Sequence, residues 1–175
     1  LQMNATSALQ ELALNDANAT AIVAAGAISP LVQLLSSTRG ALLLQANAAG
    51  ALRPLAVDCD NAATIVAAGA LPPLVPLLPA SGSTAPGAQQ NAAALLSGLA
   101  DKHAGNRVAI AAAGAVPPLV QLLGSGFPSD LQWYAAEALK NLAVDTDNQV
   151  TIAAAGAIPP LVQLLLGSRS TAQGP

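Results

Sequence analysis

A short segment that occurs four times constrains the fold of this 175-residue chain more than any other feature. It reads AIVAAGAISPLVQLL at first, and its copies lie at 21–35, 64–78, 109–123 and 151–165. The glycines inside it are 43, 45 and 42 residues apart. A second block with the same period starts at Gln2, Gln45, Gln89 and Gln132. Periods of about 20 to 50 residues are typical of stacked repeats, so the chain is predicted to form one array.

Each period carries the signals of three helices. The first is short, expected over 60–68 in one unit, with Asp or Asn placed to cap its N–H groups. A glycine then allows a sharp turn. The doublet Pro72–Pro73 falls in the first turn of the second helix, which is expected to continue to Leu78. A Gly/Ser/Pro-rich loop over 79–87 precedes the third helix, whose apolar residues have i, i+4, i+7 spacing at Ala48, Leu52 and Leu55.

Composition excludes several classes of protein. With 53% hydrophobic residues the chain is too apolar for a disordered segment. Its six Lys and Arg residues are scattered and its net charge is −3, so no nucleic-acid partner is expected. Residues 61–100 carry no charge, but prolines interrupt them, and no membrane insertion is expected. Without a secretory signal, an intracellular location, cytoplasmic or nuclear, is predicted.

Few side chains could support chemistry. Cys59 is the one cysteine and His103 the one histidine, which excludes a disulfide framework and catalysis that needs two histidines. Four aspartates precede first helices, and capping explains them better than a metal, since a calcium loop also needs Gly and a distal Glu: Asp58, Asp60, Asp145 and Asp147. We therefore predict no enzyme, no cofactor and no metal site.

The repeated strings resemble the armadillo repeat, the three-helix unit of β-catenin and importin-α. The pattern N-x-x-x-I-x-x-A-G-A-I-P-P-L-V-x-L-L is clearest at 148–165, and the pattern A-A-x-A-L-x-N-L-A lies before it at 135–143. The resemblance implies an all-α, right-handed α-solenoid. Its expected parts are a third helix at 1–14, full repeats at 15–57, 58–101 and 102–144, two helices at 145–167, and a polar tail at 168–175.

In the armadillo family the third helices line a concave groove. On the last of them Asp130, Tyr134, Glu137 and Asn141 fall within about 60° of one another, at 100° per residue. Asn recurs at the place of Tyr134 in the earlier copies although it is a poor helix former. These residues are either groove contacts or simply the polar outer face of the helix. The candidate partner-binding residues are Asn47, Asn91, Asp130, Trp133, Tyr134, Glu137 and Asn141.

The resemblance does not extend to the cargo site of the nuclear-import adaptors. Their groove uses Asn amides and Trp shelves, and only Asn141 matches the Asn position here. The Trp position holds Ser7, Gly50, Ala94 and Glu137. Trp133 lies at another position, where it is either a surface binding anchor beside Tyr134 or a packing residue against the next third helix.

Three functions remain open from the sequence. The first is a non-enzymatic interaction scaffold that binds an extended peptide or a helix of a protein partner along the concave groove. The second, from similar repeats in plants, is the substrate-recognition segment of a U-box ubiquitin ligase. The third is an architectural or engineered repeat segment. Uncapped apolar ends also predict a homodimer, through Leu1, Leu9 and Leu12 or through Leu161, Leu164 and Leu165.

Overall fold

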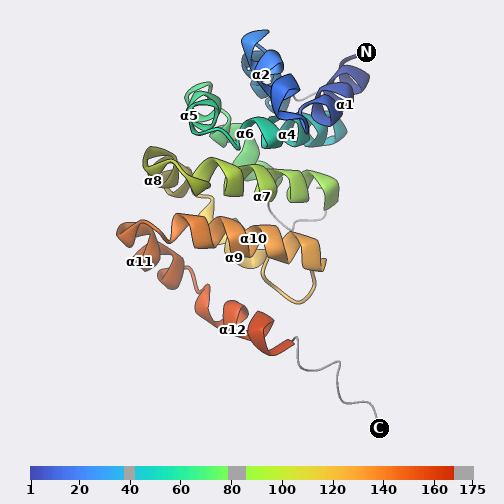
Figure 1. Cartoon of the computed structure of the whole chain (residues 1–175). Coiled ribbons are helices and arrows are strands. Elements are labelled where there is room, and N and C mark those ends of the chain that lie inside the picture. Colours follow the sequence, from blue (N-terminus) through green and yellow to red (C-terminus); the bar gives the residue numbers. More distant parts are fainter. Residues whose placement is uncertain (38–41, 79–85, 168–175) are drawn as a thin grey trace.

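A computed structural model of the protein describes residues 1–37, 42–78 and 86–167, which fold into helices joined by turns (Figure 1). The first helices of the repeats are α2 (Asp16–Ala24), α5 (Cys59–Ala67), α8 (Ala104–Ala112) and α11 (Thr146–Ala154). The second helices are α3 (Ile28–Leu35), α6 (Leu71–Leu74) with the 3-10 turn η1 (Val75–Leu77), α9 (Val116–Gln121) and α12 (Ile158–Gly167). The third helices are α1 (Gln2–Leu12), α4 (Leu42–Leu55), α7 (Pro86–Asp101) and α10 (Ser129–Leu142).

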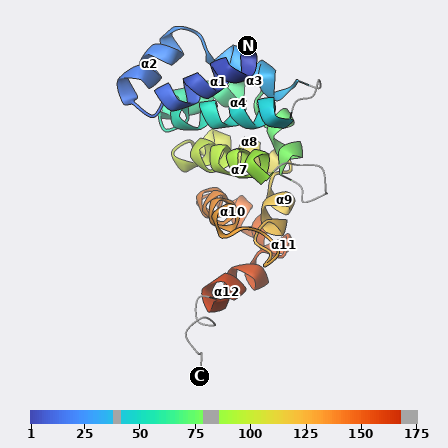
Figure 2. The same ribbon diagram turned by 90° about the vertical axis from the view of Figure 1, so that its right-hand side faces the viewer.

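The third helices form the spine of the molecule. Helix α1 packs on α4, α4 on α7 and α7 on α10, and both views show an elongated stack (Figures 1 and 2). The apolar residues predicted on the third helix, Ala48, Leu52 and Leu55, are almost completely buried. Alanines on the same helices are buried too, which lets neighbouring backbones approach closely. The predicted all-α solenoid is confirmed.

The turns between first and second helices depend on glycine. Gly26, Gly69, Gly114 and Gly156 have φ between 77° and 87°, a region in which a side chain is strained. Each of them follows the last turn of a first helix and redirects the chain. Helices α2 and α3 are bent by 85° relative to each other, and α11 and α12 by 81°.

Side-chain caps begin the first helices, but only two of the four aspartates predicted to cap are caps. Asp58 accepts a hydrogen bond from the Asn61 N–H at 2.9 Å, and Asp145 accepts from the Asn148 N–H at 3.1 Å. Asp60 and Asp147 lie in the first turns of α5 and α11, where a negative charge complements the helix dipole.

The second helix of one unit is not continuous. We expected a helix to Leu78, but α6 ends at Leu74 and a 3-10 turn follows. Pro76 explains the difference, because its missing N–H and its ring are incompatible with the helical bond to the residue four positions earlier. The predicted loop over 79–87 also ends earlier, since α7 begins at Pro86. Residues 79–85 of that loop, and the polar tail at 168–175, lie outside the described residues.

No single helix in the described part of the chain is long and apolar enough to cross a membrane. Only the bent pairs α2–α3 and α11–α12 reach the necessary length and composition, and each does so across its sharp turn.

Candidate binding groove

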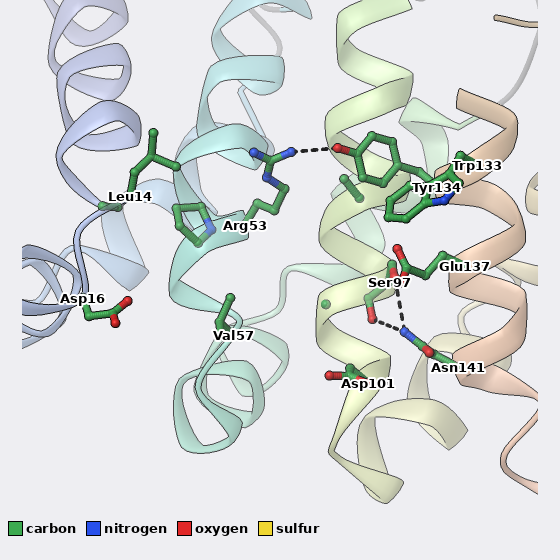
Figure 3. Close-up of a pocket in the computed structure, with 14 residues that line it drawn as sticks. Leu14, Asp16, Arg53, Val57, Ser97, Asp101, Trp133, Tyr134, Glu137 and Asn141 are labelled. Carbon is green, nitrogen blue, oxygen red and sulfur yellow. Dashed lines mark hydrogen bonds between the residues drawn. The ribbon is translucent and has the colours of Figure 1, made fainter. Parts of the chain in front are cut away.

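A groove of about 560 Å³ runs across α4, α7 and α10, with the end of α1 and the start of α2 at one side (Figure 3). Each of the three third helices contributes residues from its C-terminal half, and α10 also contributes Trp133 and Tyr134 from its second turn. The lining residues are Ala13, Leu14, Asp16, Arg53, Pro54, Val57, Ala94, Ser97, Gly98, Asp101, Trp133, Tyr134, Glu137 and Asn141.

Small residues on the middle helix open this groove. Where α10 has Tyr134 and Asn141, α7 has Asn91 and Gly98, with Ala94 between them. Ala94 and Gly98 line the floor and project little above the backbone. As a consequence Arg53 on α4 reaches over α7, and its guanidinium NH1 donates to the Tyr134 hydroxyl at 3.1 Å (Figure 3). The two residues are 81 positions apart in the chain.

An aromatic pair forms one wall. The rings of Trp133 and Tyr134 meet edge to face, with centroids 4.9 Å apart and planes at 79°. This is a favourable arrangement for aromatic rings. Tyr134 is half-buried, whereas Trp133 remains 57% exposed. The indole therefore presents most of its surface to solvent beside the groove.

Carboxylates outnumber cations along the groove. Asp16, Asp101 and Glu137 line it together with a single guanidinium, that of Arg53. Glu137 also forms an ion pair with Lys140 at 3.3 Å, one turn away on the exposed side of α10. An exposed pair of this kind contributes little to stability, so the Glu137 carboxylate remains available to a ligand. A groove lined mainly by one sign of charge concentrates ions of the other sign.

The asparagine side chains make contacts between repeats. Asn141 is 7% exposed, and its amide donates to the backbone carbonyl and the hydroxyl of Ser97 at 3.1 and 3.2 Å. The Asn91 amide donates to the Ala46 carbonyl at 2.8 Å, and the Asn47 amide to the Ser7 hydroxyl at 3.0 Å. Each amide thus uses at least one donor to connect its third helix to the previous one.

The structure brings together four of the seven candidate residues. Trp133, Tyr134, Glu137 and Asn141 all line the groove. The other three, Asn47, Asn91 and Asp130, are not among its lining residues. Asn47 and Asn91 share the helix position of Tyr134, but their shorter amide side chains bond to the previous third helix. Asp130 lies in the first turn of α10, one turn before Tyr134.

Sequence reasoning missed the charged residues Arg53, Asp16 and Asp101. Arg53 lies inside α4, Asp101 is the last residue of α7, and Asp16 is the first residue of α2. One signal was present. Asp101 occupies the position of Val57 and Val144 in the neighbouring repeats. A charged residue where the other copies are apolar indicates a position with a separate role.

The lone histidine and cysteine have structural contacts. His103 caps α8, and its Nδ1 accepts from the Asn106 N–H at 3.1 Å. The Cys59 thiol lies 3.9 Å from the Lys102 carbonyl. Neither residue lines the groove. Within the ranges that the structure describes, no three His, Cys, Asp or Glu side chains are grouped so that they could hold a metal ion.

Comparison with known families decides the relationship of the chain. The model of the armadillo/β-catenin-like repeat matches residues 15–57, 58–101 and 103–144. The chain belongs to this family. The three matched armadillo repeats contain α2 to α10, and therefore most of the groove. A comparison with curated protein sequences gives no match.

Solved structures of designed armadillo repeat proteins share this fold. One is 30% identical over 93% of this chain and 67% of its own, with a TM-score of 0.82. Another, computationally designed for modular peptide recognition, is 30% identical over 93% and 67% of the two chains, with a TM-score of 0.80. A third was solved in complex with the peptide (KR)4, and is 27% identical over 93% and 66%, with a TM-score of 0.79. This chain thus spans about two thirds of their length.

Proposed function

We propose that this armadillo array is a non-enzymatic binding module that holds an extended peptide in the groove across α4, α7 and α10. One observation carries the proposal: the exposed Trp133 ring and the Glu137 carboxylate stand side by side at the groove. An aromatic side chain next to a carboxylate suits a ligand that is partly apolar and partly cationic. Lys and Arg side chains have this character, because an aliphatic stem carries their charge.

The expected ligand is therefore a peptide with a Lys or Arg beside an apolar or aromatic anchor. Its cation would lie against one of the carboxylates that α10 and α7 contribute to the groove, Glu137 or Asp101. Its stem, or the neighbouring anchor, would cover the face of Trp133, and a cation near an indole ring gains about 0.5–2 kcal/mol. A partner that offers only acidic side chains would be repelled.

The contact between Arg53 and Tyr134 prepares the groove for such a ligand. The hydrogen bond fixes the Tyr134 ring before binding, so less side-chain freedom is lost when the ligand arrives. It also directs the single guanidinium of the groove toward a phenol and away from the carboxylates. An incoming cation then meets the carboxylates with less competition.

Recognition of the peptide backbone rests on the asparagine N–H donors and oxygen acceptors that are not already hydrogen-bonded. An Asn amide has two N–H donors and an oxygen acceptor. Asn91 and Asn47 each donate one hydrogen bond to the previous helix, and both are only half-buried. A peptide long enough to continue from the groove past the second turns of α4 and α7 can bond to their remaining donors and acceptors. Asn141 is different, since it is buried and serves mainly to hold α10 on α7.

The armadillo relatives support a peptide ligand of this charge. One designed neighbour is described as made for modular peptide recognition and another is in complex with (KR)4, an alternating basic peptide. This chain has four of its candidate residues, including Glu137, in a groove across its third helices. A basic peptide is therefore the first probe to use.

The test measures fluorescence anisotropy of a labelled (KR)4 peptide titrated with the protein, with an alternating Lys–Glu peptide of the same length as the negative control. Trp133→Ala should weaken binding of (KR)4 about tenfold, the usual loss for a central aromatic contact. Glu137→Gln should weaken it several-fold, and more strongly at low salt.

The matched control is Gln121→Lys, on the exposed surface of α9 and outside the groove. It changes the net charge by the same amount as Glu137→Gln, and we expect less than a twofold effect. If Trp133→Ala and Glu137→Gln both bind like the original chain, the groove is not the binding site. If Gln121→Lys weakens binding as much as Glu137→Gln, the peptide responds to overall charge alone.

A further inference from the structure

The groove contains a cation that no carboxylate of the described residues neutralises. Arg53 carries the one guanidinium among the lining residues, and three carboxylates line the same groove. Within the described residues the ion pair is that of Lys140 with Glu137, and Arg53 forms none. Arg53 donates instead to the neutral Tyr134 hydroxyl, at 3.1 Å. A guanidinium has five N–H donors, so this half-buried side chain keeps donors for a ligand.

The Tyr134 hydroxyl adds a second donor at the same place. Its oxygen accepts the hydrogen bond from Arg53, and its own proton can be donated to a ligand, since a phenol both donates and accepts. A carboxylate has two oxygens, of which one can accept from the guanidinium and the other from the hydroxyl. Hydrogen bonds with charged groups are the strong ones. Arg53 and Tyr134 together therefore form a site for a carboxylate.

The position of this site within the groove indicates what kind of carboxylate it takes. Figure 3 shows Arg53 in the middle, with Leu14 and Asp16 on one side and Trp133 and Glu137 on the other. The groove thus continues past the guanidinium in both directions. A peptide that follows the whole groove passes Arg53 with the middle of its chain, and not with its end. The matching group is the side chain of an Asp or Glu, and not a C-terminal carboxylate.

The spacing of the helices relates this site to the acidic part of the groove. The Arg53 side chain reaches over α7, whereas Glu137 lies on α10. Packed helices are about 8–10 Å apart. In an extended peptide residues i and i+2 point to the same side and are about 7 Å apart, and the length of a Lys or Arg side chain covers the remainder. A basic residue two positions from the acidic one can thus reach Glu137.

We infer that the groove selects a peptide with an acidic and a basic side chain two residues apart. The acidic side chain binds Arg53 and Tyr134, and the basic one binds the carboxylates of α7 and α10. This inference rests on the proposed function and adds an acidic residue to its ligand. A strictly alternating Lys–Glu peptide does not meet the requirement, because its two kinds of charge point to opposite sides of the extended chain.

The test compares three labelled peptides by fluorescence anisotropy with the full chain. In KSESK the glutamate has a lysine two residues away on either side, so the peptide fits in both directions. KSQSK lacks the carboxylate, and KESSK has the same composition with the glutamate moved by one residue. KSESK should bind about tenfold more tightly than KSQSK, the gain from hydrogen bonds to a charged group. KESSK should bind no better than KSQSK. Attraction by the acidic groove alone predicts the opposite order, because KSQSK carries the higher positive charge.

Variants assign the preference to the two donors. Arg53→Met removes the guanidinium and keeps an apolar stem, and should reduce the ratio of the two Kd values, KSQSK over KSESK, from about ten to about one. Tyr134→Phe removes the hydroxyl alone and should reduce that ratio to about three. Since both peptides meet the same variant, a general loss of affinity cancels in the ratio. The matched control is Lys102→Met, an exposed position outside the groove, which removes the same charge and should keep the ratio near ten. Circular dichroism checks that each variant is folded.

Two results would overturn the inference: KSQSK that binds the original chain as tightly as KSESK, or a preference for KSESK that survives in Arg53→Met. A third peptide pair tests the kind of carboxylate. If KSA with a free C-terminal acid binds about tenfold more tightly than its amide, the site takes chain ends, and the assignment to a side chain is wrong. Binding of (KR)4 without any preference for KSESK would remove this inference and leave the proposed function intact. If neither (KR)4 nor KSESK binds, the proposed function fails and this inference fails with it.

Discussion

Helices α3 and α12 have almost the same sequence and opposite environments. They read ISPLVQLL and IPPLVQLL from Ile28 and Ile158, and differ at one position. In α3 the isoleucine, the first leucine, the valine and the last leucine are buried, while in α12 the same four positions are half-buried or exposed. Both segments are nevertheless helical. In this array the local sequence determines the helix, and the adjacent repeat determines how much that helix contributes to stability.

The largest difference in stability is expected when the equivalent leucine is truncated in both helices. Leu35→Ala should lower the free energy of unfolding by about 2–5 kcal/mol, because it leaves a cavity in a packed core. Leu165→Ala should change it by less than about 0.5 kcal/mol, since the side chain is 76% exposed. Urea unfolding at low protein concentration measures both. Equal losses would show that the end of the solenoid is covered in solution.

A second comparison concerns the asparagines that join third helices. Asn141→Ala should cost about 1–3 kcal/mol, because it removes two buried hydrogen bonds, to the carbonyl and the hydroxyl of Ser97. Asn47→Ala removes an exposed bond to the Ser7 hydroxyl, which water can replace, and should cost less than about 0.5 kcal/mol. The measurement is the same unfolding titration. A larger loss at Asn47 would mean that the contact between α1 and α4 is stronger than the contact between α7 and α10.

Glycine substitutions should lower stability equally at the turn before the buried helix α3 and at the turn before the exposed helix α12. Gly26 and Gly156 have φ of 77° and 81°, and Ala in this region costs about 1–2 kcal/mol wherever it occurs. We expect similar decreases in Tm for Gly26→Ala and Gly156→Ala. The control is Gly87→Ala in the first turn of α7, where an added methyl group meets no atom within 4 Å, and which should be neutral or stabilising. A much smaller effect at Gly156 would show that the last repeat is already open.

The smallest expected effect separates two helix caps. Asp145 accepts hydrogen bonds from two backbone N–H groups, whereas Asn15 accepts one, at 3.2 Å. Asp145→Ala should therefore cost about 1 kcal/mol and Asn15→Ala about 0.5 kcal/mol. Circular dichroism during thermal unfolding resolves the difference. Asp145→Asn keeps the cap, and it should retain nearly the original stability.

Much of the fold could be predicted from the sequence because its signals are local and repeated. The glycines at the turns and the aspartates at the caps act on neighbouring backbone, so a pattern such as Gly69 followed by Pro72–Pro73 predicts the same turn in every unit. The failures were local as well. Pro76 interrupts a second helix at the place where the other three copies have glutamine, at Gln33, Gln121 and Gln163.

The groove was harder to predict because it depends on distances between repeats. Helical spacing correctly placed Tyr134, Glu137 and Asn141 on one face of α10. It could not show that Asn47 and Asn91 bond to the previous helix, since that depends on how closely two backbones approach. Arg53 was missed for a related reason. Its contact with Tyr134 exists because α7 has small residues between them, and no single helix reveals it.

The hydrogen bond from Arg53 to Tyr134 has a mechanical consequence. In most solenoids each unit contacts only its immediate neighbours, so the joints between units bend independently. This bond connects α4 with α10 and spans the two joints on either side of α7. Straightening the groove side requires both joints to open together and the bond to break first. The centre of the molecule therefore resists extension as one piece, while the outer helices beyond it remain free to flex.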